Sequence, residues 1–175
     1  MSDTSTARPR QTNASEITSA AGGLHRPSRA NDLAYGAFYG GALGGSVIAM
    51  FFLIMDALRG QALYTPSMMG TALFLDTIVP GVRIDMVALF SIVHFAAFFA
   101  LGGVASWLHL TRESVRGRAV VLGATIFGLL TAALFLGNWL LMDGVVAAIG
   151  VVEVLIANAL TAVAMAAFIT KALPG

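Results

Sequence analysis

The stretch AVVLGATIFGLLTAALFLGNWLLM, residues 119–142, decides the fold of this chain, because no ionisable side chain interrupts it. A hydrocarbon core about 30 Å thick needs about 20 helical residues to cross, so this run is long enough to span a bilayer. Three more apolar runs, 33–56, 84–108 and 145–170, are interrupted away from their ends only by His94 and Glu153. Asp143-Gly144 predicts a tight hairpin between the last two runs. The sequence therefore predicts an all-α integral membrane protein, with a four-helix transmembrane bundle in residues 32–175.

The composition agrees with lipid as the solvent. Of the 175 residues 58% are hydrophobic and 11% charged, whereas soluble domains are about half apolar and a quarter charged. The chain has no cysteine, which excludes disulfides, thiolate metal sites and cysteine nucleophiles. A formal net charge of +1 gives a nucleic acid no electrostatic reason to bind.

Two segments lie outside the four runs. Residues 1–31 are rich in Ser, Thr, Ala and Arg and predict a disordered cytoplasmic tail. Residues 66–79 predict a short helix between the first two spans, with Thr65 as its N-cap, Pro66 in its first turn and Pro80 after its end. This helix is about 21 Å long, too short to cross a bilayer, so we expect it to be interfacial or re-entrant.

The positive charges set the expected topology. With four spans, the ten Lys and Arg residues divide unequally between the two sides of the membrane, and only Arg59 and Arg83 fall on the side with fewer of them. Five spans would divide the ten cations equally. The side with more of them holds Arg8, Arg10, Arg26, Arg29, Arg112, Arg116, Arg118 and Lys171. By the positive-inside rule both termini are cytoplasmic. We expect a multi-pass protein of a bacterial cytoplasmic (inner) membrane, with the lipid bilayer as its first partner.

Glycines form two rows on the first predicted span. Gly36, Gly40 and Gly44 recur every fourth residue, in a GxxxG pattern, and Gly41 and Gly45 form a second row about 100° round the axis. Such rows let another backbone approach closely in lipid. They predict either packing against the chain's own helices or a docking face for a partner chain or a second copy.

His94 and Glu153 are the ionisable residues inside the predicted spans, where charge is costly and side chains usually face the bundle interior. Counted from the spans' ends, both lie about 14–15 Å deep. They therefore form a candidate polar pair, although each facing a different neighbour is an open alternative. Asn158 extends the pair into a possible polar track with Thr161 and Thr131. We expect no metal site, because His94 and Glu153 supply only two ligands.

A group of charged and aromatic residues is expected at the outer membrane boundary. It includes Asp56, Arg59, Asp76, Trp139 and Asp143, and interfacial anchoring accounts for residues of these types. The alternative is a contact surface for a partner outside the membrane.

Three hypotheses about function follow. The first is a non-enzymatic accessory or scaffold subunit of a larger membrane complex, or a homo-oligomer, that packs through the glycine-rich first helix. The second is a small oligomeric transporter or channel that uses His94, Glu153 and Asn158. The third is a subunit that binds haem or a pigment through His94 as the single ligand. No metalloprotease HExxH motif or GxSxG nucleophile elbow is present, so no enzyme is expected.

Overall fold

The computed structural model describes residues 28–111, 117–140 and 144–173, and within these ranges the chain forms helices and no strand. Four helices are long and apolar enough to cross a membrane, which confirms the four predicted runs: Arg29–Leu58, Ile84–Thr111, Arg118–Leu140 and Val151–Ala172. The elements are α2 (Arg29–Tyr35), η1 (Gly36–Gly40), α3 (Gly41–Leu58), α4 (Tyr64–Leu75), α5 (Ile84–Thr111), α6 (Arg118–Leu140), α7 (Val145–Ile149) and α8 (Val151–Ala172).

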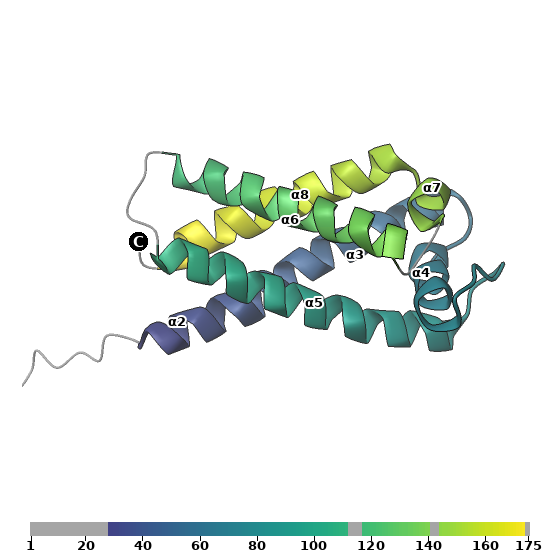
Figure 1. Cartoon of the computed structure of the whole chain (residues 1–175), viewed down its shortest axis with the longest axis horizontal. Coiled ribbons are helices and arrows are strands. Elements are labelled where there is room, and N and C mark those ends of the chain that lie inside the picture. Colours follow the sequence, from purple (N-terminus) through teal and green to yellow (C-terminus); the bar gives the residue numbers. More distant parts are fainter. Residues whose placement is uncertain (1–27, 112–116, 141–143, 174–175) are drawn as a thin grey trace, which may run out of the picture.

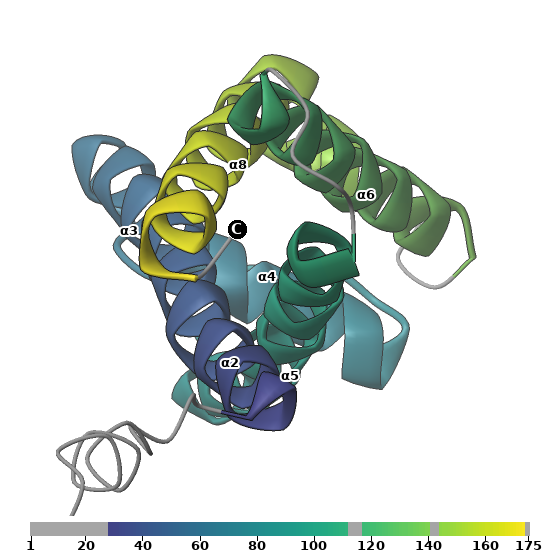
Figure 2. The ribbon, with the colours of Figure 1, turned by 90° about the vertical axis from the view of Figure 1, so that its left-hand side faces the viewer.

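The long helices run side by side as a bundle (Figure 1). Viewed from one end, they follow one another round the bundle in the order α5, α2–α3, α8 and α6 (Figure 2). Packing is extensive between α3 and α5, between α3 and α8 and between α6 and α8, but slight between α5 and α6. The described beginning of α2, the end of α5 and the end of α8 share one end, here called the terminal end, and α4 and α7 lie at the other, the capped end (Figure 1).

The first long helix begins earlier than predicted. Ser28 is its N-cap and accepts a hydrogen bond from Asn31 N, and Asp32 lies in the first turn, where a negative charge interacts favourably with the helix dipole. The predicted boundary at residue 31 therefore falls inside α2. Residues 1–27, on which the prediction of a disordered tail mainly rests, lie outside the described residues.

The first glycine row faces the last turns of α8, although it crosses the π-helical segment η1. Gly36 lies against Leu173, at the end of α8, Gly40 against Ile169 and Gly44 against Met165. A Cβ at Gly36 would also overlap Ser106 on α5. A π-turn has i→i+5 hydrogen bonds, and Gly36 stands where it begins. Both rows are used inside the chain.

The second glycine row seats α5 against α3. A Cβ on Gly41 would lie 2.5 Å from the Phe98 carbonyl oxygen, and one on Gly102 would lie 2.7 Å from Gly41 N. Gly45 faces the ring of Phe95. These distances allow only glycine at the crossing of the two backbones, so α3 and α5 approach each other through Gly41 and Gly102.

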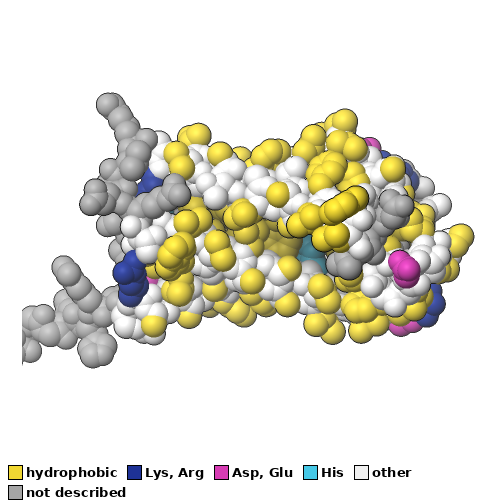
Figure 3. Space-filling model, viewed as in Figure 1, with side chains coloured by type: hydrophobic (Ala, Val, Ile, Leu, Met, Phe, Trp, Pro, Cys, Tyr) yellow, Lys and Arg dark blue, Asp and Glu magenta, His cyan; other side chains and the backbone are white. Residues whose placement is uncertain are grey.

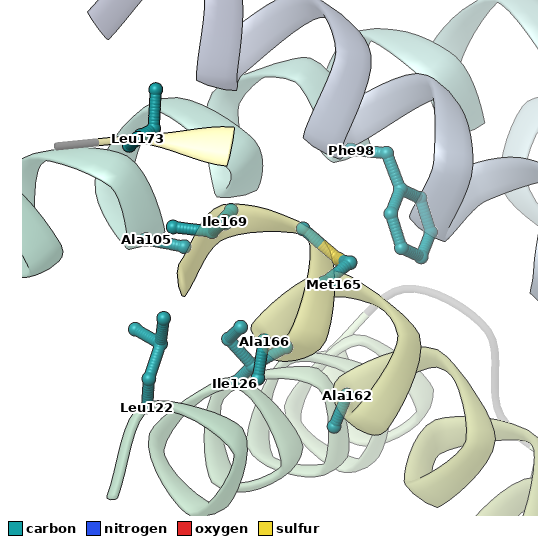
Figure 4. Close-up of a cluster of buried hydrophobic side chains, with 9 residues drawn as sticks. All are labelled: Phe98, Ala105, Leu122, Ile126, Ala162, Met165, Ala166, Ile169 and Leu173. Atoms are coloured by element: carbon teal, nitrogen blue, oxygen red, sulfur yellow. The ribbon is translucent and has the colours of Figure 1, made fainter. Parts of the chain in front are cut away.

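A cluster of buried side chains joins α5, α6 and α8 (Figure 4). Met165 and Ile169 of α8 are fully buried in it, and Ile126 of α6 is 1% exposed. Its other members are Phe98, Ala105, Leu122, Ala162, Ala166 and Leu173. The buried residues among those described for α6 are Leu122 and Ile126, so this cluster anchors α6 through its first half.

The short helix α4 lies across the capped end of the bundle (Figure 1). It spans Tyr64–Leu75. The predicted helix was 66–79, so α4 begins two residues earlier than predicted and ends four residues earlier than predicted. Leu63, the residue before it, has φ 68° and Asp76, the residue after it, has φ 51°; these left-handed residues stop the helix on both sides. Gly70 allows contact with the Met86 backbone of α5.

The fourth predicted run is divided by Gly150. This residue has φ 108° and ψ 126°, a conformation that L-residues rarely adopt, and it separates α7 from α8. The predicted simple hairpin is therefore wrong, since α7 stands between α6 and α8. Val145 and Ile149 of α7 are buried with Met68, Ala72 and Val154 in a second apolar cluster, which holds α4 and α7 together at the capped end.

At the terminal end, two arginines complete the last turn of α5. Arg118 donates to the His109 carbonyl oxygen at 2.7 Å, and Arg29 donates to the Leu110 carbonyl oxygen at 3.2 Å. The last carbonyls of a helix have no partner within the helix, and cations near them also interact favourably with its dipole. The beginnings of α2 and α6 are thus tied to the end of α5.

Candidate functional site

His94 lies in the middle of α5 and contacts α3. Its Nε2 atom is 3.1 Å from the carbonyl oxygen of Gly45. Three phenylalanine rings surround the imidazole, with centroids 5.6 Å away for Phe90, 5.3 Å for Phe95 and 4.8 Å for Phe98. The polar environment of the ring is therefore one backbone carbonyl inside an aromatic cage, defined by Phe90, Phe95 and Phe98.

Glu153 has a different partner. Its carboxylate forms an ion pair of 3.0 Å with Arg59, the residue that ends α3, and it lies in the first turn of α8. The structure therefore does not bring His94 and Glu153 together, and each faces its own neighbour, the alternative left open above. The depth estimate for Glu153 was wrong because Gly150 ends α7 before α8 begins, which places the carboxylate at the end of the helix.

Asn158 forms part of the predicted polar track. Its side-chain nitrogen donates to Thr131 Oγ1 of α6 at 3.2 Å. Thr161, one turn further along α8, is fully buried, and its hydroxyl has no hydrogen-bond partner among the described residues. The track thus contains one interhelical hydrogen bond between α6 and α8 and a separate hydroxyl. Such a pair is typical of polar groups that stabilise helix contacts in lipid.

Asp56 is buried rather than exposed at an interface. It is 2% exposed, and its carboxylate accepts hydrogen bonds from Thr65 N at 2.6 Å and from Thr65 Oγ1 at 2.7 Å. A carboxylate that binds an N–H in the first turn acts as a helix cap. Asp56 thus faces the protein interior, where it joins the end of α3 to the start of α4.

The other predicted boundary residues behave differently from one another. Trp139 is 77% exposed near the end of α6, and Asp76 is exposed after α4. Arg59 is half exposed in its ion pair with Glu153. Asp143 lies outside the described residues. No shared binding site joins these residues in the described part of the chain.

Sequence reasoning missed two hydroxyls that hold the connection from α4 to α5. Ser67 Oγ accepts from Arg83 N at 2.8 Å and donates to the Gly81 carbonyl oxygen at 3.4 Å. One turn later, Thr71 Oγ1 accepts from Val79 N at 3.3 Å. The spacing of four residues between two small hydroxyl residues was the available signal, since it puts both on one face of the helix.

The same connection ends in an ion pair between neighbouring side chains. Arg83 lies 2.6 Å from the Asp85 carboxylate. The hydrogen bond to Asp85, and then its charge, raise the pKa of the Arg83 guanidinium above its usual value. Both side chains are about half exposed, so the pair contributes little to stability.

Ser106 and His109 form a second buried polar group at the terminal end. Ser106 is fully buried and His109 is 3% exposed. Neither the Ser106 hydroxyl nor the His109 ring nitrogens have a hydrogen-bond partner among the described residues. Sequence reasoning assigned no role to either residue. Their spacing of three residues, which puts both on one face of α5, was the available signal.

Within the described residues, no group of three or more His, Cys, Asp or Glu side chains is placed to hold a metal ion. Comparisons with protein-family models, with curated proteins and with solved structures find no significant match to this chain.

Proposed function

We propose that the chain is an integral protein of a bacterial cytoplasmic membrane, that it crosses the bilayer four times and that both termini are cytoplasmic. Apolar side chains cover the middle of the bundle and charged side chains lie at its two ends (Figure 3). Arg29, Arg118 and Lys171 belong to the terminal end and Arg59 and Arg83 to the capped end, as the positive-inside rule requires for this orientation. In this arrangement α4 lies at the outer surface of the membrane.

Within the membrane, we propose that the chain is a non-enzymatic accessory or scaffold subunit. The observation that carries this proposal is a small-residue stripe on α6. Gly128 has no described atom within 4 Å of the position of a Cβ, and Ala124 and Ala132, four residues to either side, are exposed. Small residues at this spacing let a second helix approach closely in lipid.

The exposed outer side of α6 supports its assignment as the docking helix. The glycines of η1 and α3 contact the chain's own α5 and α8, so the proposed docking face moves from the first long helix to α6. This helix packs mainly on α8, and Leu129 and Leu136 on its outer side are 43% and 53% exposed. A partner helix on the stripe would cover apolar surface that the chain itself does not use.

The charged residues argue against chemistry or ion transport inside the bundle. Arg59 neutralises Glu153 at the capped end, and Asp56 is bound to Thr65. Asn158 forms one short contact, with Thr131. A proton or cation route normally contains carboxylates in the membrane interior, and here Glu153 is held at a helix end.

A substitution on the stripe tests the proposal. Gly128→Leu fills the space that a partner helix would occupy, whereas Ala133→Leu places the same side chain five residues away, about 140° round the helix axis. We expect Gly128→Leu to release the partner, or the second copy, from the native complex in mild detergent, and Ala133→Leu to leave the complex intact. Native mass spectrometry distinguishes a second copy from a different subunit by mass.

Two outcomes would overturn the subunit proposal. One is a complex of unchanged size in Gly128→Leu, with the variant still folded by circular dichroism. The other is solute flux in proteoliposomes that Glu153→Gln abolishes while the fold is retained, which would replace the subunit proposal by transport.

A further inference from the structure

The hydrogen bond to Gly45 determines which nitrogen of His94 carries the proton. A carbonyl oxygen only accepts, so Nε2 must donate to the Gly45 oxygen at 3.1 Å. In the neutral ring the lone pair then belongs to Nδ1. Within the described residues Nδ1 has no hydrogen-bond partner. His94 therefore presents an acceptor, held in one tautomer by the α3 backbone.

The His94 side chain is partly exposed on the side of the bundle. Figure 3 shows a hollow on the face between α5 and α6, with a histidine side chain at its floor. Of the described histidines, His94 is partly exposed in the middle of α5 and His109 is buried at the end of that helix. The contact between α5 and α6 is slight, and in the aromatic cage Phe90 and Phe95 are partly exposed.

Leaving Nδ1 of His94 without a hydrogen-bond donor is unfavourable, and lipid hydrocarbon in the hollow would supply none. An ionisable side chain in a span usually faces the bundle interior or a polar partner, because an acyl chain offers no hydrogen bond. The aromatic cage is also suited to a flat ring, since aromatic pairs are stabilised in offset and edge-to-face arrangements. The required occupant therefore combines a hydrogen-bond donor, a flat head and an apolar body.

We propose that the hollow between α5 and α6 binds a lipid-soluble phenol or quinol, whose hydroxyl donates to Nδ1 of His94 and whose ring packs against Phe90, Phe95 and Phe98. A small molecule suits the hollow better than a partner helix. The cluster of Leu122, Ile126 and Phe98 joins α6 to α5 at one end of it, and a helix about 10 Å wide would have to separate them. The apolar body extends between the helices into the lipid.

This site is independent of the docking stripe on α6, because it requires no second chain. The purified full-length protein in lipid nanodiscs is titrated with a para-alkylphenol and, separately, with the matching para-alkylanisole, in which a methyl group replaces the donor hydrogen. We expect saturable binding of the phenol that is about tenfold tighter than binding of the anisole, the effect of one neutral hydrogen bond.

Two variants locate the binding. His94→Phe keeps a ring of similar size but removes the acceptor, and it should weaken phenol binding about tenfold without changing anisole binding. Trp107→Phe, at an exposed position of the same helix, should bind both compounds like the natural chain. Equal binding of phenol and anisole, or unchanged phenol binding in His94→Phe, would overturn the proposal.

A measurement on the unsubstituted chain keeps the test valid if His94→Phe does not fold. In ¹⁵N spectra of histidine-labelled protein we expect the Nε2–H tautomer for His94 and a shift of its Nδ1 signal when the phenol is added, with no shift on addition of the anisole. An Nδ1 signal that does not respond contradicts the proposal. A visible absorption band that depends on His94 also contradicts it, because Nδ1 would then be the ligand of a bound pigment or haem.

Discussion

The guanidinium of Arg59 lies 3.0 Å from the carboxylate of Glu153, and this contact joins the end of α3 to the first turn of α8. The two side chains are 48% and 28% exposed. An ion pair with this exposure contributes at most about 1 kcal/mol. The contact ties the first turn of α8, just after the break at Gly150, to the end of α3.

Charge reversal tests this pairing. Glu153→Arg places two guanidinium groups together and should lower the melting temperature, and adding Arg59→Glu should restore most of the loss. We expect a coupling of about 0.5–1 kcal/mol between residues 59 and 153 from a double-mutant cycle. The control is a double-mutant cycle between Glu153→Gln and His94→Gln. The two changes in stability should add, because these side chains do not contact each other. Coupling in the second cycle but not in the first would contradict the observed geometry.

Asp56 provides a second test. Asp56→Ala leaves the Thr65 amide and hydroxyl without their acceptor in a buried site, and should destabilise the chain by about 1–3 kcal/mol. Asp76→Asn is the control, because Asp76 is exposed and asparagine tolerates a left-handed backbone. Thermal unfolding in detergent, followed by circular dichroism, measures both. Equal melting temperatures for the two variants would show that the Asp56 cap has no energetic effect.

Adjacent glycines in the first long helix should respond in opposite ways to alanine. Gly41→Ala places a methyl group 2.5 Å from the Phe98 carbonyl oxygen and 2.7 Å from Phe99 Cα, and the backbone of α5 cannot move without disturbing the bundle. We expect a loss of about 1–3 kcal/mol. Gly40→Ala meets Ile169 at 3.5 Å, an ordinary contact, and should be neutral or stabilising by up to about 1 kcal/mol. Denaturant midpoints measure both variants. A lower midpoint for Gly40→Ala than for Gly41→Ala would contradict the assignment of Gly41 to the contact with α5 and of Gly40 to the contact with α8.

The break before α8 depends on glycine. At Gly150, φ is 108°, so Gly150→Ala should cost about 1–3 kcal/mol in backbone strain. Gly103→Ala is the matched control in α5, where the new methyl group would meet Ala37 at 3.5 Å. If Gly150→Ala unfolds at the same temperature as Gly103→Ala, then α7 and α8 can form one continuous helix and Glu153 returns to the depth predicted from the sequence.

The four long helices could be predicted because each is specified by its own residues. Runs without charge, such as 119–142, fix where a helix of sufficient length occurs whatever it packs against. The depth of Glu153 could not be predicted in this way. It depends on the backbone conformation of Gly150, and a glycine inside an apolar run is compatible with either a continuous or a broken helix.

The direction of each polar side chain was harder to predict than its position along the helix. At the π-segment η1, Gly36 meets α5 as well as the end of α8, whereas Gly40 meets α8, and no periodic pattern marks such a segment. Asp56 was interpreted as a surface residue because its partner, Thr65, follows a turn whose path the sequence does not specify. The apolar sequence on both sides of His94 was enough to identify it as unusual. Its partner could not be predicted, because the Gly45 carbonyl oxygen is a backbone atom that any residue would provide.

The attachment of α6 mainly to α8 has a consequence for biosynthesis. The chain leaves the ribosome from its N-terminus, so α6 is made before the helix that buries Ile126 and Leu122 exists. Until α8 is released, α6 has only slight contacts with α5 and α7 to hold it. A nascent chain stopped before Val151 therefore contains three long helices of which two are packed together, and the final helix completes the bundle by bringing the third into place.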